Sequence, residues 1–309
     1  MAGPASDRLP PGVTVFERGW LSANNILCQG PEGAALIDSG YATHSDQTLA
    51  LLAHRLAGAP LERLFNTHLH SDHCGGNAAL QACHPGLRTA IPPGEAAAVR
   101  SWDEAALSYR ATGQLCPRFH FDALLRPGGE VVLAGRPWQV HAAPGHDPHS
   151  VLFFEPESRT LVSADALWEN GFGVVFPELD GQQAFAEVGA TLDLIESLAP
   201  ATVIPGHGPV FGEVGRALET ARRRLDGFVR DPGRHALYAA KVLLKFKLLE
   251  LQQVPVARFT GWAAGTPLLQ SMAQAQAPGL PPQTWAHELV EQLCASGAAR
   301  LEGGMLSNA

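Results

Sequence analysis

The chain has 309 residues, of which 46% are hydrophobic and 17% are charged, and its formal net charge at pH 7 is −8. A chain of this length and composition can bury a sizeable core, and its length suggests one large domain with a smaller one. The acidic balance argues against a general nucleic-acid-binding or anionic membrane surface, and no apolar run is long enough to span a bilayer.

The first part of the chain predicts short strands followed by a helix. Apolar runs at residues 13–17, 25–28 and 34–38 are separated by polar or Gly/Pro turns, which is typical of an antiparallel meander. Residues 48–56 have helical character, and residues 64–67 form a strand. This strand leads directly into the run Thr67-His68-Leu69-His70-Ser71-Asp72-His73.

That run places three imidazoles and a carboxylate within six residues. Three further candidate ligands follow, each at the end of an apolar, strand-like run: His146, Asp165 and His207. Imidazole and carboxylate are suitable ligands for zinc and similar divalent ions. Seven ligands are too many for one tetrahedral ion, but they are enough for two ions that share a carboxylate.

The middle of the chain repeats the strand pattern. Strand-like runs occur near residues 131–133, 139–142, 151–154 and 161–164, and a final one at 203–204 carries His207. Residues 184–198 form a long helix candidate that Pro200 ends. Strand blocks with interleaved helices predict two sheets packed face to face and covered by helices.

The ordered set His-x-His-x-Asp-His, then His, Asp and His, resembles the metallo-β-lactamase superfamily over roughly the first three quarters of the chain. The resemblance implies an α+β fold, the αββα sandwich of two mixed sheets covered by helices. It also implies that His68, His70 and His146 hold a first metal ion. Asp72, His73 and His207 would hold a second, with Asp165 bridging the two. Zinc is the expected ion, with manganese and iron as alternatives.

Asp38 follows a predicted strand in Leu36-Ile37-Asp38-Ser39-Gly40. In proteins that this sequence resembles, an Asp at this place bonds the free nitrogen of a metal-bound histidine, which sets the tautomer and raises ligand basicity. The competing interpretation is an Asx turn that ends the strand. The sequence leaves both interpretations open.

The character of the chain changes at about Asp231, where Asp231-Pro232-Gly233 resembles a linker. We therefore predict a catalytic domain at 1–230 and a second domain at 231–309. Helices at about 236–251, 256–259, 266–274 and 283–295, followed by a hairpin at 297–306, resemble the winged-helix appendage of some superfamily members, the lactamase-β-like-2 type. Five Lys or Arg against four Glu in residues 235–309 leave too little positive charge for a phosphate-binding surface.

Aromatic residues near the ligands predict a partly apolar substrate pocket. The candidates are Tyr109, Phe119, His120, Trp168 and Phe172. Core packing is the competing explanation for each of them, and it is weakest for Trp168, which lies three residues after a candidate ligand. Asp72 is placed to orient the nucleophile and to carry its proton, besides binding metal.

The sequence thus predicts a dinuclear metal-dependent hydrolase of an ester, thioester or lactone. The alternatives are a phosphodiesterase or ribonuclease of the same fold, an iron-dependent sulfur dioxygenase, and a non-catalytic DNA-binding protein. Glyoxalase II carries a Gly-Asp-Thr-Leu-Phe motif where this chain has Ala164-Asp165-Ala166-Leu167-Trp168, so glutathione thioesters are open but not favoured.

Composition also predicts the compartment and the partners of the protein. Five cysteines without paired spacing, and a start that lacks the apolar core of a signal peptide, indicate the cytoplasm. We expect a small-molecule substrate and no membrane or nucleic-acid partner, and the sequence leaves a homodimer open.

Overall fold

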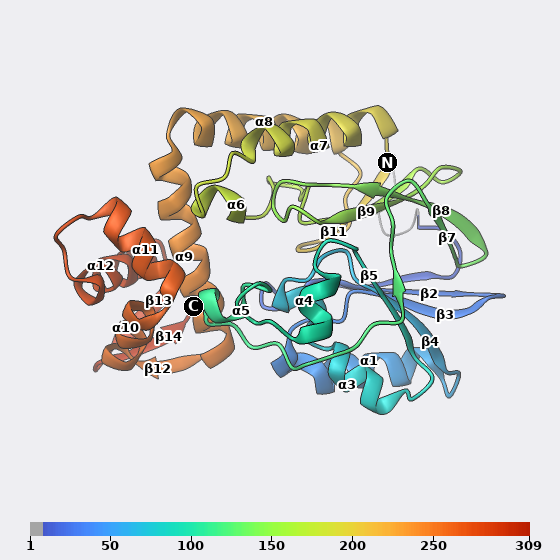
Figure 1. Cartoon of the computed structure of the whole chain (residues 1–309), viewed down its shortest axis with the longest axis horizontal. Coiled ribbons are helices and arrows are strands. Elements are labelled where there is room, and N and C mark those ends of the chain that lie inside the picture. Colours follow the sequence, from blue (N-terminus) through green and yellow to red (C-terminus); the bar gives the residue numbers. More distant parts are fainter. Residues whose placement is uncertain (1–8) are drawn as a thin grey trace. The chain divides into compact units, whose positions relative to one another are not determined.

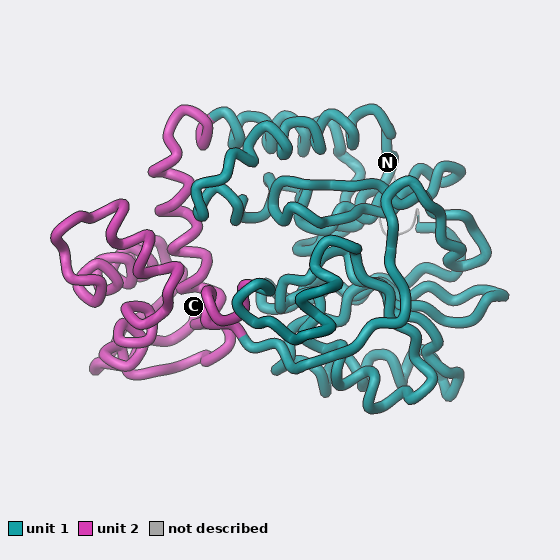
Figure 2. The backbone as a smooth tube through the Cα atoms, viewed as in Figure 1, with its two compact units in different colours: residues 1–107, 115–226 teal, residues 108–114, 227–309 magenta. Residues whose placement is uncertain are grey.

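The computed structural model describes residues 9–309. Residues 1–8, which include the start of the predicted first domain and the stretch considered for a signal peptide, lie outside the described residues. The chain forms two compact units, one of residues 1–107 and 115–226 and the other of residues 108–114 and 227–309 (Figure 2). The sequence predicted domains at 1–230 and 231–309. The second unit differs from the predicted second domain because it also contains residues 108–114.

The first sheet of the first unit has six strands in the order of the chain. The strands β1 to β3 pair antiparallel, as the predicted meander requires, and β3 to β6 pair parallel. The strands are β1 (Val13–Phe16), β2 (Asn25–Gly30), β3 (Gly33–Ile37), β4 (Leu61–Phe65), β5 (Arg88–Ile91) and β6 (Ala123–Leu124).

The second sheet has five strands in the order β11-β10-β9-β8-β7. Its strands are antiparallel except for the parallel pair β10 and β11. Because those two strands run in the same direction, the residues that follow them emerge at the same edge of the sheet. The strands are β7 (Glu130–Leu133), β8 (Arg136–Ala142), β9 (Val151–Glu155), β10 (Thr160–Ala164) and β11 (Thr202–Pro205).

The strands β2 and β3 of the first sheet are mostly buried, and their alternate side chains enter two different cores. Ile26 and Ile37 point into a cluster that also contains Phe153 and Val162 of the second sheet. Their neighbours Leu27 and Leu36 point the other way. The predicted strands at 25–28 and 34–38 therefore lie between two cores, in the middle of a sandwich.

Helices cover the outer faces of both sheets (Figure 1). The leucines of α1 and α3 close the outer cluster of the first sheet with Leu27 and Leu36, and α7 and α8 lie along the second sheet. This arrangement confirms the predicted sandwich of two mixed sheets covered by helices. The helices of this unit are α1 (Ser45–Leu56), α2 (Ser71–Cys74), α3 (Asn77–Cys83), α4 (Ala96–Ser101), α6 (Phe176–Leu179), α7 (Phe185–Leu198) and most of α8 (Val214–Arg230), with a 3-10 turn at Ala42–His44.

The second unit combines four longer helices with a small sheet. The helices are α9 (Pro232–Leu251), α10 (Val256–Gly265), α11 (Pro267–Gln276) and α12 (Pro282–Ala295), and the short helix α5 (Tyr109–Thr112) joins them. The sheet has the order β12-β14-β13, from Gln253–Pro255, Met305–Asn308 and Ala299–Glu302. The predicted hairpin is present as β13 and β14, and the pairing strand β12 was not predicted. The likeness to a winged helix stays a prediction.

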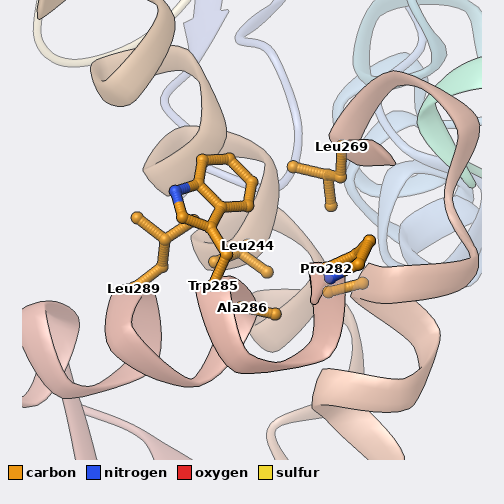
Figure 3. A pocket seen from close by; sticks show the side chains of 7 residues that line it. Leu244, Leu269, Pro282, Trp285, Ala286 and Leu289 are labelled. Carbon is orange, nitrogen blue, oxygen red and sulfur yellow. The ribbon is translucent and has the colours of Figure 1, made fainter. Parts of the chain in front are cut away.

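Leu244, Leu269 and Trp285 come together from α9, α11 and α12 around a shallow apolar hollow (Figure 3). Its cavity volume is close to 0 Å³, so it is part of the core of this unit and not a binding cavity.

The predicted linker at Asp231 is instead a helix start. Helix α8 ends at Arg230 and α9 begins at Pro232, so a single residue separates them. The Asp231 side chain accepts a hydrogen bond from the backbone amide of Arg234 at 3.0 Å, and Pro232 occupies the first position of the helix. Proline suits that position because its missing amide proton has no partner there in any case. Within residues 9–309, no helix is long and apolar enough to cross a membrane.

Candidate metal centre

The seven candidate ligands lie in the loops and the short helix that follow strands. His68 and His70 follow β4, and Asp72 and His73 lie in the short helix α2 that comes next. His146 lies between β8 and β9, and the last two ligands follow the parallel strands β10 and β11: Asp165 and His207. Rigid strands thus position side chains that are far apart in the chain.

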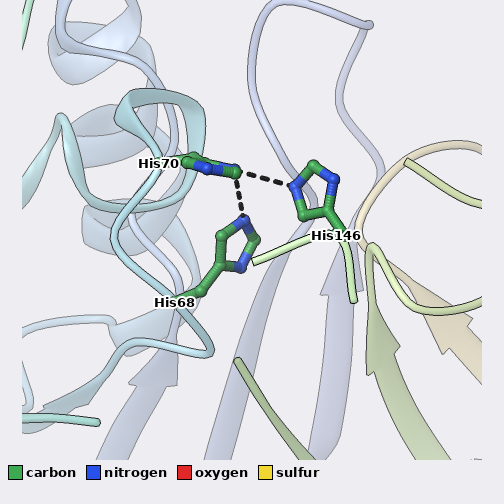
Figure 4. A group of neighbouring side chains, drawn as sticks. All are labelled: His68, His70 and His146. Atoms are coloured by element: carbon green, nitrogen blue, oxygen red, sulfur yellow. Dashed lines mark hydrogen bonds between the residues drawn. The ribbon is translucent and has the colours of Figure 1, made fainter. Parts of the chain in front are cut away.

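Three histidines form a first cluster: His68, His70 and His146 (Figure 4). His70 Nδ1 lies 3.1 Å from His68 Nε2 and 2.7 Å from His146 Nε2. His146 Nδ1 lies 2.5 Å from the Val174 carbonyl oxygen and must donate to it, so the neutral ring presents a lone pair at Nε2. His70 Nδ1 carries at most one proton, so it cannot donate a separate hydrogen bond to each of the other two nitrogens. Hydrogen bonding alone therefore does not explain why the three nitrogens converge.

The protonation of this cluster suits metal binding. Burial lowers the pKa of His68 well below its ordinary value, and the neighbouring histidines lower it further. Burial and then His70 lower the pKa of His146 to about 4. Both rings are therefore neutral near pH 7, which is the form that binds a metal ion.

A second cluster contains Asp72, His73, Asp165 and His207. His207 Nε2 lies 3.0 Å from Asp72 Oδ2. His73 Nε2 lies 3.4 Å from Asp165 Oδ1 and 3.9 Å from Asp72 Oδ2, yet this buried nitrogen makes no hydrogen bond within the described part of the chain. Two carboxylates and two imidazoles with an unsatisfied nitrogen among them are a donor set for a divalent cation.

Asp165 joins the two clusters. Its Oδ2 lies 3.3 Å from His146 Nε2 in the first cluster, and its Oδ1 faces His73 Nε2 in the second. Burial raises the pKa of Asp165, but His207, His73 and His146 outweigh burial and hold that pKa well below its ordinary value. The Asp165 carboxylate is therefore ionised and has one oxygen toward each cluster.

Asp38 lies behind the second cluster. Its Oδ2 is 2.8 Å from His73 Nδ1, and Thr67 donates to the same carboxylate from its backbone amide at 2.9 Å and its hydroxyl at 2.8 Å. Burial opposes protonation of His73, but Asp38, Asp165 and Asp72 together raise the pKa of His73 well above its ordinary value. That shift describes the metal-free ring, and a bound cation would compete with the proton for Nε2.

Gly206 has to be glycine because of this packing. A Cβ atom at this position would lie 2.2 Å from Asp165 Oδ1 and 3.0 Å from the His73 ring. The turn that presents His207 therefore approaches the other ligands more closely than any side chain would allow.

The structure brings one predicted pocket residue to the ligands. The Trp168 indole nitrogen donates to Asp165 Oδ1 at 3.2 Å, and its ring meets the His207 ring edge-on at 5.5 Å. Phe119 instead packs on Trp102 at 5.4 Å, and the backbone of His120 bonds to Gln81. Two other predicted pocket residues are buried: Phe172, and Tyr109 in helix α5 of the second unit.

Sequence reasoning missed two aromatic residues at the site. Trp20 stacks on the His207 ring, with centroids 5.4 Å apart and 10° between the planes. Phe176 packs edge-on against His70 at 4.8 Å and His146 at 5.7 Å. Both lie far along the chain from the rings that they touch, so no local pattern could have pointed to them.

The residues present fit a pair of divalent ions. Within each cluster the ligand atoms lie within 4.8 Å of one another. Metal–nitrogen bonds of about 2.0–2.1 Å in a tetrahedron place neighbouring ligands about 3.3 Å apart, close to the nitrogen separations in the first cluster. Neutral imidazoles and ionised carboxylates are the protonation states that such ions require.

Comparison with known proteins places the chain among known families. Residues 18–207 match the family model described as "Metallo-beta-lactamase superfamily". The structure titled "TTHA1623 in a di-iron-bound form" is 30% identical, covers 68% of this chain and 98% of its own, and superposes with a TM-score of 0.54.

Two curated relatives carry the names of hydrolases. A hydroxyacylglutathione hydrolase of Synechococcus sp. (strain JA-3-3Ab) is 33% identical over 57% of this chain and 59% of its own length. The acyl-coenzyme A thioesterase MBLAC2 of Gallus gallus is 25% identical over 62% of this chain and 74% of its own length. The match to the first relative thus spans little more than half of that protein.

Proposed function

Because the chain belongs to the metallo-beta-lactamase superfamily, we propose that it is a dinuclear metal-dependent hydrolase of thioesters, with esters and lactones as related substrates. The observation that carries this proposal is the position of Asp165. One carboxylate oxygen faces the three-histidine cluster, and the other faces the second cluster. A shared carboxylate between two nitrogen-rich clusters suits two cooperating cations.

We assign the ligands by cluster. His68, His70 and His146 would hold the first ion, and Asp72, His73 and His207 the second, with Asp165 shared. Zinc is the proposed ion because the ligands are mainly imidazoles. Iron is the first alternative, since a relative has been described with two irons, and manganese is the second.

The ions would supply a water of lowered pKa and positive charge opposite the developing oxyanion of the substrate. Asp72 is proposed to orient the attacking water and to accept its proton. Burial raises the pKa of Asp72, but His73 and His207 outweigh burial and hold the pKa below its ordinary value. Asp72 is therefore ionised near pH 7, and its carboxylate can accept a hydrogen bond from the attacking water.

The curated relatives support thioesters as the substrate class. The names of both relatives describe hydrolysis of a thioester, of glutathione in one and of coenzyme A in the other. The motif at residues 164–168 differs from that of glyoxalase II, so the acyl or thiol part of the substrate need not be the same. The exposed indole of Trp20 and the partly exposed Trp168 beside His207 favour a substrate with an apolar portion.

The remaining proposals rest on composition. A cytoplasmic location follows from the sparse cysteines, a small molecule is the expected partner, and a homodimer is open. We also propose that the second unit is a winged helix. We expect it to have no nucleic-acid partner, because five Lys or Arg stand against four Glu in residues 235–309.

The test is a substrate screen on metal-free protein reloaded with zinc, manganese or iron. The substrates are a hydroxyacyl-glutathione, a long-chain acyl-coenzyme A, an aryl ester, a lactone and a phosphodiester. We expect metal-dependent cleavage of a thioester that is lost in His146→Ala.

Other outcomes would point to the alternatives. Turnover of the phosphodiester alone would favour the nuclease alternative. Oxygen uptake by a form with one iron would favour the dioxygenase. Inactivity of every form, together with steeply salt-dependent binding to duplex DNA, would favour a DNA-binding protein.

A further inference from the structure

The imidazole of His207 lacks the support that three other candidate ligands have. His73 Nδ1 is bonded to Asp38 at 2.8 Å, His146 Nδ1 to the Val174 carbonyl at 2.5 Å, and His68 Nδ1 lies 3.1 Å from the Thr67 hydroxyl. His207 Nδ1 is buried and has no hydrogen-bond partner within residues 9–309. A metal-bound histidine normally donates its second ring N–H to a neighbour, which fixes the orientation of the ring.

Aromatic rings surround His207 in place of that hydrogen bond. The Trp20 indole is parallel to the imidazole, with 10° between the planes and 5.4 Å between the centroids. Trp168 meets the same imidazole edge-on, and it meets Trp20 at 5.3 Å with 70° between the planes. Contacts on the face and on the edge of one ring restrict its rotation about the Cβ–Cγ bond.

The loop that carries Trp20 is fastened to the turn that carries His207. The backbone amide of Asn24 donates to the Gly206 carbonyl at 2.7 Å. The Asn24 side-chain amide donates to the carbonyls of Pro205 at 3.0 Å and Gly208 at 2.8 Å. Asn24 therefore binds the turn on both sides of His207 and holds the two segments in register.

The same loop is joined to another ligand of this cluster. The backbone amide of Ala23 donates to the Asp72 carbonyl at 3.0 Å. The side chain of Trp20 is nevertheless 56% exposed, so core burial does not account for its position. Its ring contacts are with Trp168 and His207 at the candidate metal centre.

We propose that Trp20 is a positioning residue for the second metal ion: it orients His207 by stacking, and Asn24 keeps the two segments together. The inference rests on the proposed dinuclear site, in which His207 is a ligand. Stacking on Trp20 would fix the orientation of the His207 ring, as a hydrogen bond does for His73, His146 and His68.

The test compares Trp20→Leu and Trp20→Phe by titrating zinc into metal-free protein. We expect Trp20→Leu to lower the zinc affinity of the second site by about 10–100-fold, the range that loss of a ligand's supporting contact produces. The affinity of the first site should stay within about twofold of the original. Trp20→Phe keeps a ring on His207 and should recover most of the affinity. Trp262→Leu, at an indole in the second unit beside Phe259, is the matched control and should bind both ions as the unmodified protein does.

A double-mutant cycle separates positioning from a general effect on the fold. If Trp20 acts through His207, adding Trp20→Leu to His207→Ala should change the affinity of the weakened site by less than about twofold. Unchanged binding of both ions by Trp20→Leu, or an equal loss in the His207→Ala background, would overturn the inference. A lower melting temperature with no rescue by Trp20→Phe would overturn it as well. Failure of the unmodified protein to bind two ions would instead count against the proposed dinuclear function.

Discussion

His73 Nδ1 lies 2.8 Å from Asp38 Oδ2, and both side chains are buried, with 0% and 2% of their surface exposed. The carboxylate also accepts two hydrogen bonds from Thr67, so it is held from three directions. Asp38 itself has a φ of 56°, a conformation in which Asp and Asn are tolerated better than most residues. The contact sets the tautomer of His73, because a proton on Nδ1 leaves a lone pair on Nε2 for the metal.

Asp38→Asn tests this relationship with little change in shape or backbone preference. The amide oxygen can still accept from the Thr67 backbone, but its NH2 group would face the Thr67 hydroxyl and His73 Nδ1. His73 could then accept a bond at Nδ1 only by moving its proton to Nε2, the proposed ligand atom. We expect zinc affinity to fall by about 10–100-fold, measured by competition with a chelating dye.

The matched control is Asp122→Asn. Asp122 accepts a bond from the Thr89 backbone amide at 2.8 Å, which an Asn oxygen can replace. Metal affinity in that variant should stay within about twofold of the original. Equal affinity in the two variants would mean that Asp38 is only a turn residue, the other interpretation that the sequence allowed.

Asp165→Ala addresses the shared carboxylate. The purified protein should contain close to two divalent ions per chain, and the variant should lose at least one, because one oxygen of Asp165 faces each cluster. Metal content is measured by elemental analysis after desalting. Asp193→Ala removes an exposed carboxylate that pairs with Arg222 and should leave the metal content unchanged. Two ions and full activity in Asp165→Ala would show that the site is assigned wrongly.

The candidate ligands could be selected from the sequence because their order is a property of the chain itself. His68 to His73 are neighbours, and His146, Asp165 and His207 each follow a strand-like run. Parallel pairing of β10 and β11 then brings the last two together. Spacing and strand periodicity therefore selected the candidates, and the structure added the distances between them.

The surroundings of the ligands could not be predicted in the same way. Trp20, Asn24 and Phe176 reach the site through contacts between segments that are far apart, and their local sequence has no metal-ligand pattern. At Asp231-Pro232-Gly233 the local pattern fits two structures. Pro and Gly are frequent in linkers, but Asp-Pro also begins helices. The structure identifies the helix start, with the Arg234 amide bonded to the Asp231 side chain.

Phe153→Ala tests the packing between the two sheets. Phe153 is fully buried and meets Phe65 edge-on at 6.3 Å, so the two rings join the sheets directly. Deleting a buried aromatic ring removes its apolar contacts and leaves a cavity, which costs about 3–5 kcal/mol of unfolding free energy. The measurement is denaturant unfolding of the metal-loaded protein. Val132→Ala, at a side chain that is 48% exposed, should cost less than about 1 kcal/mol.

Glu95→Gln tests a pH dependence outside the ligand set. Burial and then the nearby Asp147 carboxylate raise the pKa of Glu95 from 4.5 to about 8. Between these values the folded protein keeps a proton that the unfolded chain has released, so stability must fall as pH rises. The contribution of the Glu95 proton to the free energy of unfolding is fully present below about pH 4.5, and it is lost as pH rises through about 8. Because Glu95 is partly exposed, we expect the loss of unfolding free energy to be smaller than the full difference between the two pKa values implies.

Glutamine has no such proton, so the variant should lose less stability than the original protein between pH 5 and pH 8.5. The measurement is urea unfolding at several pH values with metal present. Glu219→Gln, at an exposed position on α8, should keep the original slope and is the control. If Glu95→Gln keeps the original slope as well, Glu95 is already ionised in the folded protein at neutral pH. The contact with Asp147 would then have to be solvated, and the pKa of Glu95 would not be raised.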